Sequence, residues 1–254
     1  MKRFLRIART EVLEHRRQPW MIFILAANYV LWIGVFGALF FVIERASSRP
    51  DTLVILNQQT AAFGVDLGAF LQLTTSTFGS LIFTNLPLYV AIMCGTSVLH
   101  DRECGTMPFL MLAPVTRRLL LAGKLAGAMT IPLLLHLVFV GTSSLVLGGF
   151  ASLAPYAHKF GGSSAWWVAF LLGAPASAAF VGALGTVISA LSRDVRTSMQ
   201  YTSFFIGLLS LGIGFALVDG IQKGVTLQLV YAAGCIVATV LTLLVGAHLI
   251  SKDV

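Results

Sequence analysis

Few residues of this sequence have the types and spacing that catalysis requires. His136 lies near the middle of a long apolar run, with no acidic residue at a comparable depth. Alone it can form neither a catalytic triad nor a metal site. The sequence contains no HExxH and no GxSxG motif. We therefore predict that the chain is not an enzyme, and we expect His136 to be neutral and hydrogen-bonded to a neighbouring helix.

No phosphate-binding loop of the form GxxxxGK[ST] occurs either. The pair Gly123-Lys124 lacks the upstream glycine and is followed by Leu125. The three cysteines lie apart, Cys94 and Cys235 in apolar runs and Cys104 in a charged segment. This odd number without paired spacing predicts neither a disulfide framework nor a metal site. We expect no cofactor in this chain.

Polar side chains within the apolar runs are the remaining candidates for a site. We consider Asn28, Asn85, Tyr89 and His136 as residues that could line a path through the molecule. The alternative is that each is paired with backbone or with another side chain, because an isolated polar group in lipid is costly.

The composition places these residues in a membrane. Of 254 residues 57% are hydrophobic and 11% are charged, and the mean hydropathy is +0.89. Soluble domains carry about a quarter charged residues. The net charge of +7 comes from basic residues that flank the apolar runs, which favours lipid headgroups over nucleic acid as their partner.

Six apolar segments are long enough to cross a bilayer. They predict an all-α integral membrane protein in one domain, with spans at about 21–43, 77–99, 119–150, 165–191, 200–218 and 225–250. With the N-terminus inside, 13 of the 17 Lys and Arg residues fall on the cytoplasmic side. The positive-inside rule then predicts both termini in the cytoplasm. Lys124, near the start of the third span, is expected to extend to the interface.

The first nineteen residues predict an amphipathic helix in the headgroup plane. Its apolar face is formed by Met1, Phe4, Leu5, Ala8 and Val12, and Glu11 interrupts the pattern. Pro19 ends this helix and Trp20 marks the interface. The alternative is a simple basic anchor. The outer segment 51–76 is semi-apolar, and it is expected to lie along the outer surface or to begin a bent second span.

The connection from His100 to Arg118 is the most informative segment. Gly105-Thr106 and Pro114 bound a short apolar helix from Met107 to Ala113, with charged residues on both sides. An apolar surface exposed to the cytosol typically binds a partner. The alternative is that this helix packs only on its own bundle.

This segment resembles the first cytoplasmic loop of type-2 ABC-exporter permeases. The matching residues are Glu103, Gly105, Thr106, Leu110, Pro114, Val115, Thr116, Arg117, Gly123 and Lys124. The N-terminal helix and the six spans resemble that family's elbow helix and architecture. Pro108 departs from the family, which often has an acidic residue there, and the outer connection Asp219–Gly224 is shorter than in many relatives.

The resemblance implies partners. Two permease halves, identical or different, would each dock on a cytoplasmic ATPase that carries ATP and Mg²⁺. The contacting residues would be Glu103, Gly105, Thr106, Phe109, Leu110, Pro114, Arg117 and Arg118. A second cytoplasmic loop with Arg193, Asp194 and Arg196 is a further candidate, although a solvated turn that carries positive-inside charges explains it better. The implied location is the bacterial inner membrane. The alternatives are an ATP-independent carrier or channel, and a structural or assembly protein of the membrane.

Overall fold

The computed structural model describes residues 2–16, 19–47, 50–62, 64, 66–112, 115–147 and 163–249, and these residues are almost entirely helical. The elements are α1 (Lys2–Arg16), α2 (Pro19–Ser47), α3 (Pro50–Ala62), α4 (Leu67–Glu103), α5 (Met107–Leu112), α6 (Arg117–Leu147), α8 (Ser164–Val168), the π-helical turn η2 (Ala169–Gly173), α9 (Ala174–Leu191), α10 (Val195–Tyr201), the π-helical turn η3 (Thr202–Ile206), α11 (Gly207–Lys223) and α12 (Val225–Leu249). The predicted all-helical class is confirmed.

Six segments within these helices are long and apolar enough to cross a membrane. They run over Ile22–Arg45, Thr77–Glu103, Arg117–Thr142, Ser164–Leu191, Val195–Ile221 and Val225–Leu249. Each overlaps one predicted span. The last residues predicted for the third and sixth spans, 148–150 and 250, lie outside the described residues.

The fifth span is longer than predicted at both ends. It begins at Val195 because Asp194 caps α10, accepting a hydrogen bond from the Thr197 N–H at 2.8 Å. The span ends at Ile221, but helix α11 continues to Lys223, so most of the predicted outer connection from Asp219 is helical. The turn to α12 is made by Gly224, whose φ of 106° suits a residue without a Cβ.

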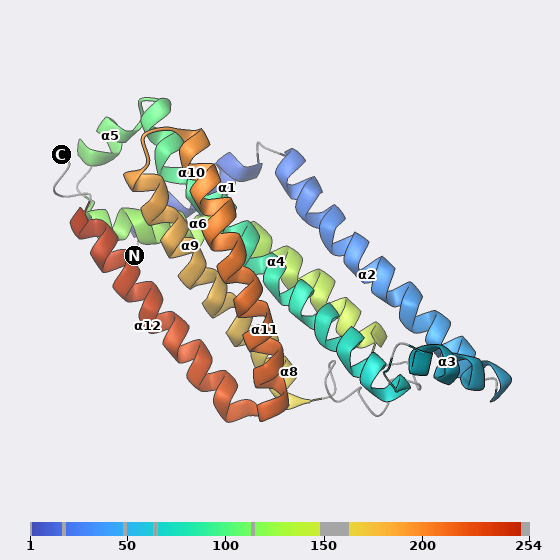
Figure 1. Cartoon of the computed structure of the whole chain (residues 1–254). Coiled ribbons are helices and arrows are strands. Elements are labelled where there is room, and N and C mark those ends of the chain that lie inside the picture. Colours follow the sequence, from blue (N-terminus) through green and yellow to red (C-terminus); the bar gives the residue numbers. More distant parts are fainter. Residues whose placement is uncertain are drawn as a thin grey trace.

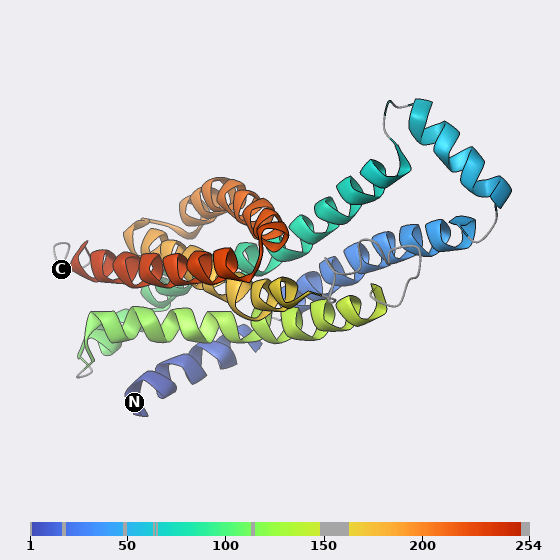
Figure 2. The same ribbon diagram turned by 90° about the horizontal axis from the view of Figure 1, so that it is seen from below.

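The helices form a bundle with two distinct ends. Figure 1 shows α5, the beginning of α1 and the end of α12 together at one end, and α3 and α8 toward the other. Seen from below, α3 projects beyond the remaining helices (Figure 2). The segment predicted to lie outside the membrane is thus divided between α3 and the first turns of α4, which Asp66 caps through the Ala69 N–H at 2.5 Å.

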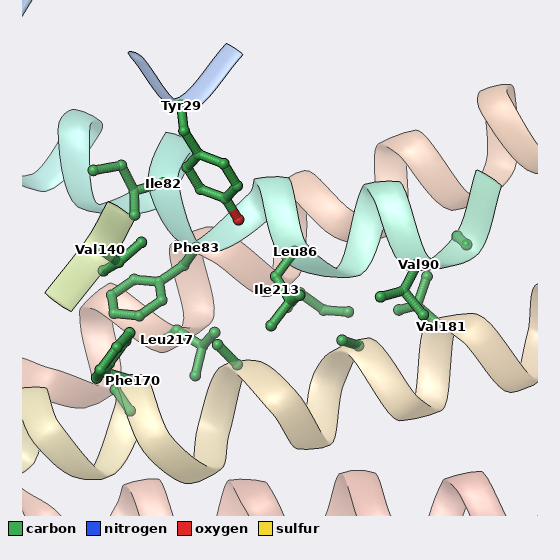
Figure 3. Packing of buried hydrophobic residues seen from close by; sticks show 14 of the residues in the cluster. Tyr29, Ile82, Phe83, Leu86, Val90, Val140, Phe170, Val181, Ile213 and Leu217 are labelled. Carbon is green, nitrogen blue, oxygen red and sulfur yellow. The ribbon is translucent and has the colours of Figure 1, made fainter. Parts of the chain in front are cut away.

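The core lies between α4 and α9. Side chains from α2, α4, α6, α9 and α11 interlock there, among them Tyr29, Phe83, Val140, Val181 and Leu217 (Figure 3). Of the residues in the most apolar stretch of α4, 72% are buried, whereas the corresponding share in α2 is 12%. The exposed apolar residues of α2 and α12 fit a lipid environment, in which an apolar surface needs no protein cover.

Glycines allow α9 to approach α4. A Cβ on Gly182 would lie 2.7 Å from Val90 Cγ1, and one on Gly185 would lie 2.7 Å from the Ala91 carbonyl oxygen. These small residues of α9 thus pack against α4 of the same chain. In α12, Gly246 packs on Val187, whereas no atom comes within 4 Å of a Cβ built on Gly234.

The prolines in the spans are accommodated within continuous helical segments. Pro87 lies inside α4 and Pro132 inside α6. Pro175 follows the π-helical turn η2, in which the Ala174 N–H bonds to the Ala169 carbonyl. Because proline has no N–H, a local change of hydrogen-bond register beside it is a common solution.

Candidate coupling site at the α5 end of the bundle

A tight turn joins α4 to α5. Gly105 has a φ of 68°, and its N–H bonds to the Arg102 carbonyl at 3.1 Å. The Thr106 N–H bonds to the Asp101 carbonyl at 2.9 Å, and the Thr106 hydroxyl donates to the same carbonyl and to Asp101 Oδ1. The start of α5 is thus fixed to the last turn of α4 through Asp101.

The predicted short helix is confirmed over Met107–Leu112. Ala113 and Pro114 lie outside the described residues, and so do the side chains of Pro108 and Phe109. Packing of this helix on its own bundle is observed for one face, and binding of a partner stays a prediction.

One face of α5 packs on the bundle. Met107 is buried and Leu110 is half-buried, in a cluster with Val98, Leu120 and Ala247. Leu112 has 82% of its surface exposed. Leu112 is therefore the described apolar side chain of α5 that is free for a partner, while Leu110 anchors the helix.

Beneath α5 lies a buried ion cluster that we call the Lys124 triad, formed by Lys124, Glu11 and Asp101. Lys124 Nζ lies 2.8 Å from Glu11 Oε2 and 2.8 Å from Asp101 Oδ2, and it donates to the Ser97 carbonyl at 3.0 Å. All three side chains are less than 10% exposed. The expectation that Lys124 extends to the interface was wrong, because two carboxylates from α1 and α4 satisfy it inside the protein.

The helix α1 packs directly on α6. A Cβ on Gly123 would lie 2.8 Å from Ile7 Cγ2, and one on Gly127 would lie 2.7 Å from the Ala8 carbonyl oxygen. Glycines four residues apart on one helix face let two backbones come this close. The G-x-x-x-G spacing of Gly123 and Gly127 in the sequence is the signal for this contact.

The face of α1 that packs on the protein carries two polar residues. Glu11, which interrupts the apolar pattern of the sequence, is buried, and so is His15. Buried Glu11 meets its counter-charge in Lys124 of α6. Leu5, on the predicted apolar face, has 55% of its surface exposed, and contact of that face with the headgroup plane stays a prediction.

The charges around the triad shift the pKa values of both glutamates of α1. Burial raises the pKa of Glu11, but contact with His15 and the charge of Lys124 outweigh burial and hold it below its ordinary value. His15 Nε2 lies 3.5 Å from Glu11 Oε1. The pKa of Glu14 is raised, first by burial and then by the charge of Glu11.

A cavity of about 410 Å³ opens between α1, α4, α5 and α6. It is lined by all three residues of the triad together with Arg6, Ile7, Thr10, Glu14, Thr106, Leu110 and Leu120. The charged side chains of the triad thus line this cavity. The structure therefore brings Thr106 and Leu110, two of the predicted contact residues, together with α1 and the start of the third span.

The sequence matches one protein-family model over most of its length. The family model described as ABC-2 family transporter protein matches residues 5–230, which is most of the chain. The chain belongs to the ABC-2 transporter family. A search of the curated proteins gives no match. As an ABC-2 permease the chain is a membrane-embedded transport subunit, and the family implies association with an ABC ATPase.

The other predicted contact residues of the permease lie around α5. Glu103 and Arg118 are exposed. Arg117 is half-buried and lines a hollow of about 500 Å³ with Thr116 and His248. These side chains lie at the same end of the bundle but outside the Lys124 triad.

The second connection of the permease lies between α9 and α10. Arg193 and Asp194 are exposed, and Arg196 is an exposed residue of the first turn of α10. The backbone hydrogen bond from Thr197 lowers the pKa of Asp194, and the Thr197 hydroxyl also donates to its carboxylate at 2.8 Å. Asp194 is thus engaged as a helix cap, and a docking role for the two arginines stays a prediction.

The predicted path residues of the permease do not share one environment. His136 is fully buried and shares a hydrogen bond of 3.2 Å with the Tyr29 hydroxyl, which confirms the expected bond to a neighbouring helix. The ring of Phe83 in α4 lies 6.3 Å from its ring, and that of Phe170 in η2 lies 5.2 Å away, measured between ring centroids. Asn85 is buried in α4, whereas Asn28 and Tyr89 are half-buried. A role in lining a path stays a prediction for all four.

Proposed function

We propose that the chain is the permease subunit of an ATP-driven exporter, and that a separate ABC ATPase docks on α5. The observation that carries this proposal is an exposed apolar side chain, Leu112, on a short helix held outside the spans by α1, α4 and α6. Family membership supports the transport role.

ATP and Mg²⁺ are assigned to the partner ATPase, since this sequence contains no phosphate-binding loop. A second permease half, identical or different, completes the transporter. The positions of 13 of the 17 Lys and Arg residues support an orientation in the bacterial inner membrane with both termini and α5 in the cytoplasm.

Docking of α5 has a plain energetic basis. Burying a large apolar side chain such as Leu112 contributes about 1.5–3 kcal/mol. Glu103 and Arg118 are exposed beside α5 and would lie at the rim of the contact, where charge sets orientation more than affinity. Leu110 contributes indirectly, because it fixes the helix on the bundle.

The test is pull-down of candidate ABC ATPases, co-expressed with the tagged permease and solubilised together. Leu112→Asp should reduce ATPase recovery about tenfold, as expected for losing at least 1.4 kcal/mol of binding. Thr226→Asp is the matched control, because Thr226 is an exposed residue at the opposite end of the bundle, in the first turn of α12.

Undiminished ATPase recovery by a well-folded Leu112→Asp variant would reject docking through α5. Transport that persists in a strain lacking every candidate ATPase would instead favour an ATP-independent carrier.

A further inference from the structure

The Lys124 triad joins three elements that are far apart in the sequence. Glu11 comes from α1, Asp101 from the last turn of α4, and Lys124 from the second turn of α6. Asp101 is also the residue that holds Thr106 at the start of α5. One ammonium group therefore connects the N-terminal helix with the turn that carries α5.

Burial of this cluster is costly unless the charges are held in fixed geometry. Taking ions out of water carries a desolvation penalty that their mutual attraction offsets only when geometry and additional hydrogen bonds are good. Lys124 meets this condition with two ion pairs and a bond to the Ser97 carbonyl. Such clusters are weak evidence for stability, and fixing one register between elements is their best-attested use.

Apolar side chains also join these elements. Ile7 of α1 packs on Gly123 and belongs, with Leu110 of α5, to the apolar cluster around Val98 and Leu120. A cavity of about 410 Å³ remains between α1 and α5, and the triad lines it. Beside the apolar packing, the ion cluster supplies the directional contacts that join α1 to the α4–α5 turn.

We propose that Lys124 is a positioning residue that holds α1, the end of α4 and α5 as one rigid unit, so that movement of α5 moves α1 and α6 together. This proposal rests on the proposed function, in which the ATPase moves α5. The ion cluster transmits that movement and does not itself contact the ATPase.

The test uses spin labels on α1 and beside α5. The labelled chain carries Arg9→Cys on the exposed face of α1 together with native Cys104, which is exposed, after Cys94→Ala and Cys235→Ala. Distances are measured in nanodiscs for the permease alone, and for the complex with its ATPase without nucleotide and with ATP plus vanadate.

Three changes of the triad are compared. Lys124→Met removes the ammonium group, Lys124→Arg keeps the charge, and the triple change Glu11→Gln, Asp101→Asn and Lys124→Met replaces all charges with neutral groups of similar size. The triple variant leaves no unpaired buried charge, so it tests the role of the triad apart from folding.

The unaltered triad should give one narrow distance distribution that nucleotide does not change. The neutral triple variant should still bind the ATPase, but its distribution should broaden and shift with nucleotide. ATP hydrolysis by the ATPase bound to this variant should move the outer end of the bundle about tenfold less effectively than with the unaltered triad. That movement is measured by thiol labelling at Lys223→Cys. Lys124→Arg should restore at least half of that response.

A narrow, nucleotide-independent distance in the neutral triple variant would overturn the proposal, as would a nucleotide-dependent distance with the triad intact. These results are distinct from failure of the proposed function, which would appear as a chain with its triad intact that binds no ATPase. In that case the permease-alone distances still show whether the triad fixes α1.

Discussion

Replacement of Gly127 by alanine should loosen α1 from the bundle. A Cβ at this position would lie 2.5 Å from Glu11 Cβ and 2.7 Å from the Ala8 carbonyl oxygen. Both separations are shorter than van der Waals contact, and the second involves backbone that cannot rotate away. The helix α1 must therefore shift outward, which also lengthens the ion pair between Glu11 and Lys124.

The cost can be estimated from the packing. Inserting a methyl group into a filled contact typically costs about 1–3 kcal/mol. Alanine also favours a helix interior over glycine by about 0.8–1.0 kcal/mol, and a control must carry the same gain. Gly212→Ala is the matched control, because it makes the same exchange within α11 with no atom within 4 Å of the new Cβ.

The assay is the rate at which trypsin releases an N-terminal tag by cleaving at Arg6 and Arg9, both exposed on α1. A shift of the undocking equilibrium by about 1–3 kcal/mol raises the cleavage rate about fivefold to 160-fold. Gly212→Ala should cleave at the unaltered rate. Equal rates for the two variants would refute the close contact between α1 and α6.

Cys104, the exposed thiol, should react with a membrane-impermeant reagent only after the cytoplasmic side is opened, once Cys94 and Cys235 are replaced; labelling of intact cells would reject the orientation. His136→Ala should lower thermal stability by about 2–5 kcal/mol through the cavity that it leaves, with ATP turnover per folded complex unchanged; complete loss of turnover by a folded variant would give His136 a transport role. Because the pKa of Glu11 is lowered, its ionisation stabilises the fold at neutral pH and this contribution is lost as pH falls below 4.5, whereas the raised pKa of Glu14 makes its ionisation unfavourable at neutral pH. Melting curves at pH 7 should therefore show destabilisation by Glu11→Gln and slight stabilisation by Glu14→Gln, and both effects should diminish at about pH 4; equal effects at both pH values would contradict this.

The spans and the short helix could be predicted because their signals are local. A long apolar run in lipid forms a helix, because a helix satisfies its own backbone hydrogen bonds. The glycine and threonine before Met107 fix where the short helix begins. The predicted and observed spans overlap throughout. They differ mainly where a cap such as Asp194 lies beyond the apolar run, since hydropathy does not detect a helical turn made of polar residues.

The Lys124 triad could not be predicted from local patterns. About 90 residues of sequence separate Glu11 from Asp101, and about 23 separate Asp101 from Lys124. Each of them, taken alone, has the pattern of an ordinary charge at the membrane interface. The burial of Glu11 on α1 could not be predicted for the same reason, because amphipathicity assumes that buried positions are apolar. Two signals were nevertheless present, the G-x-x-x-G spacing around Lys124 and the single acidic interruption in the apolar face of α1.

Docking of a separate ATPase on α5 is tested most directly by site-specific photo-crosslinking. A photoreactive residue replaces Leu112 on α5, Arg196 in α10 or Thr226 at the opposite end, in cells that co-express the permease and its candidate ATPase. We expect a strong crosslink to the ATPase from position 112 and none from position 226. An intact complex that crosslinks from position 196 or 226 but never from position 112 would contradict it.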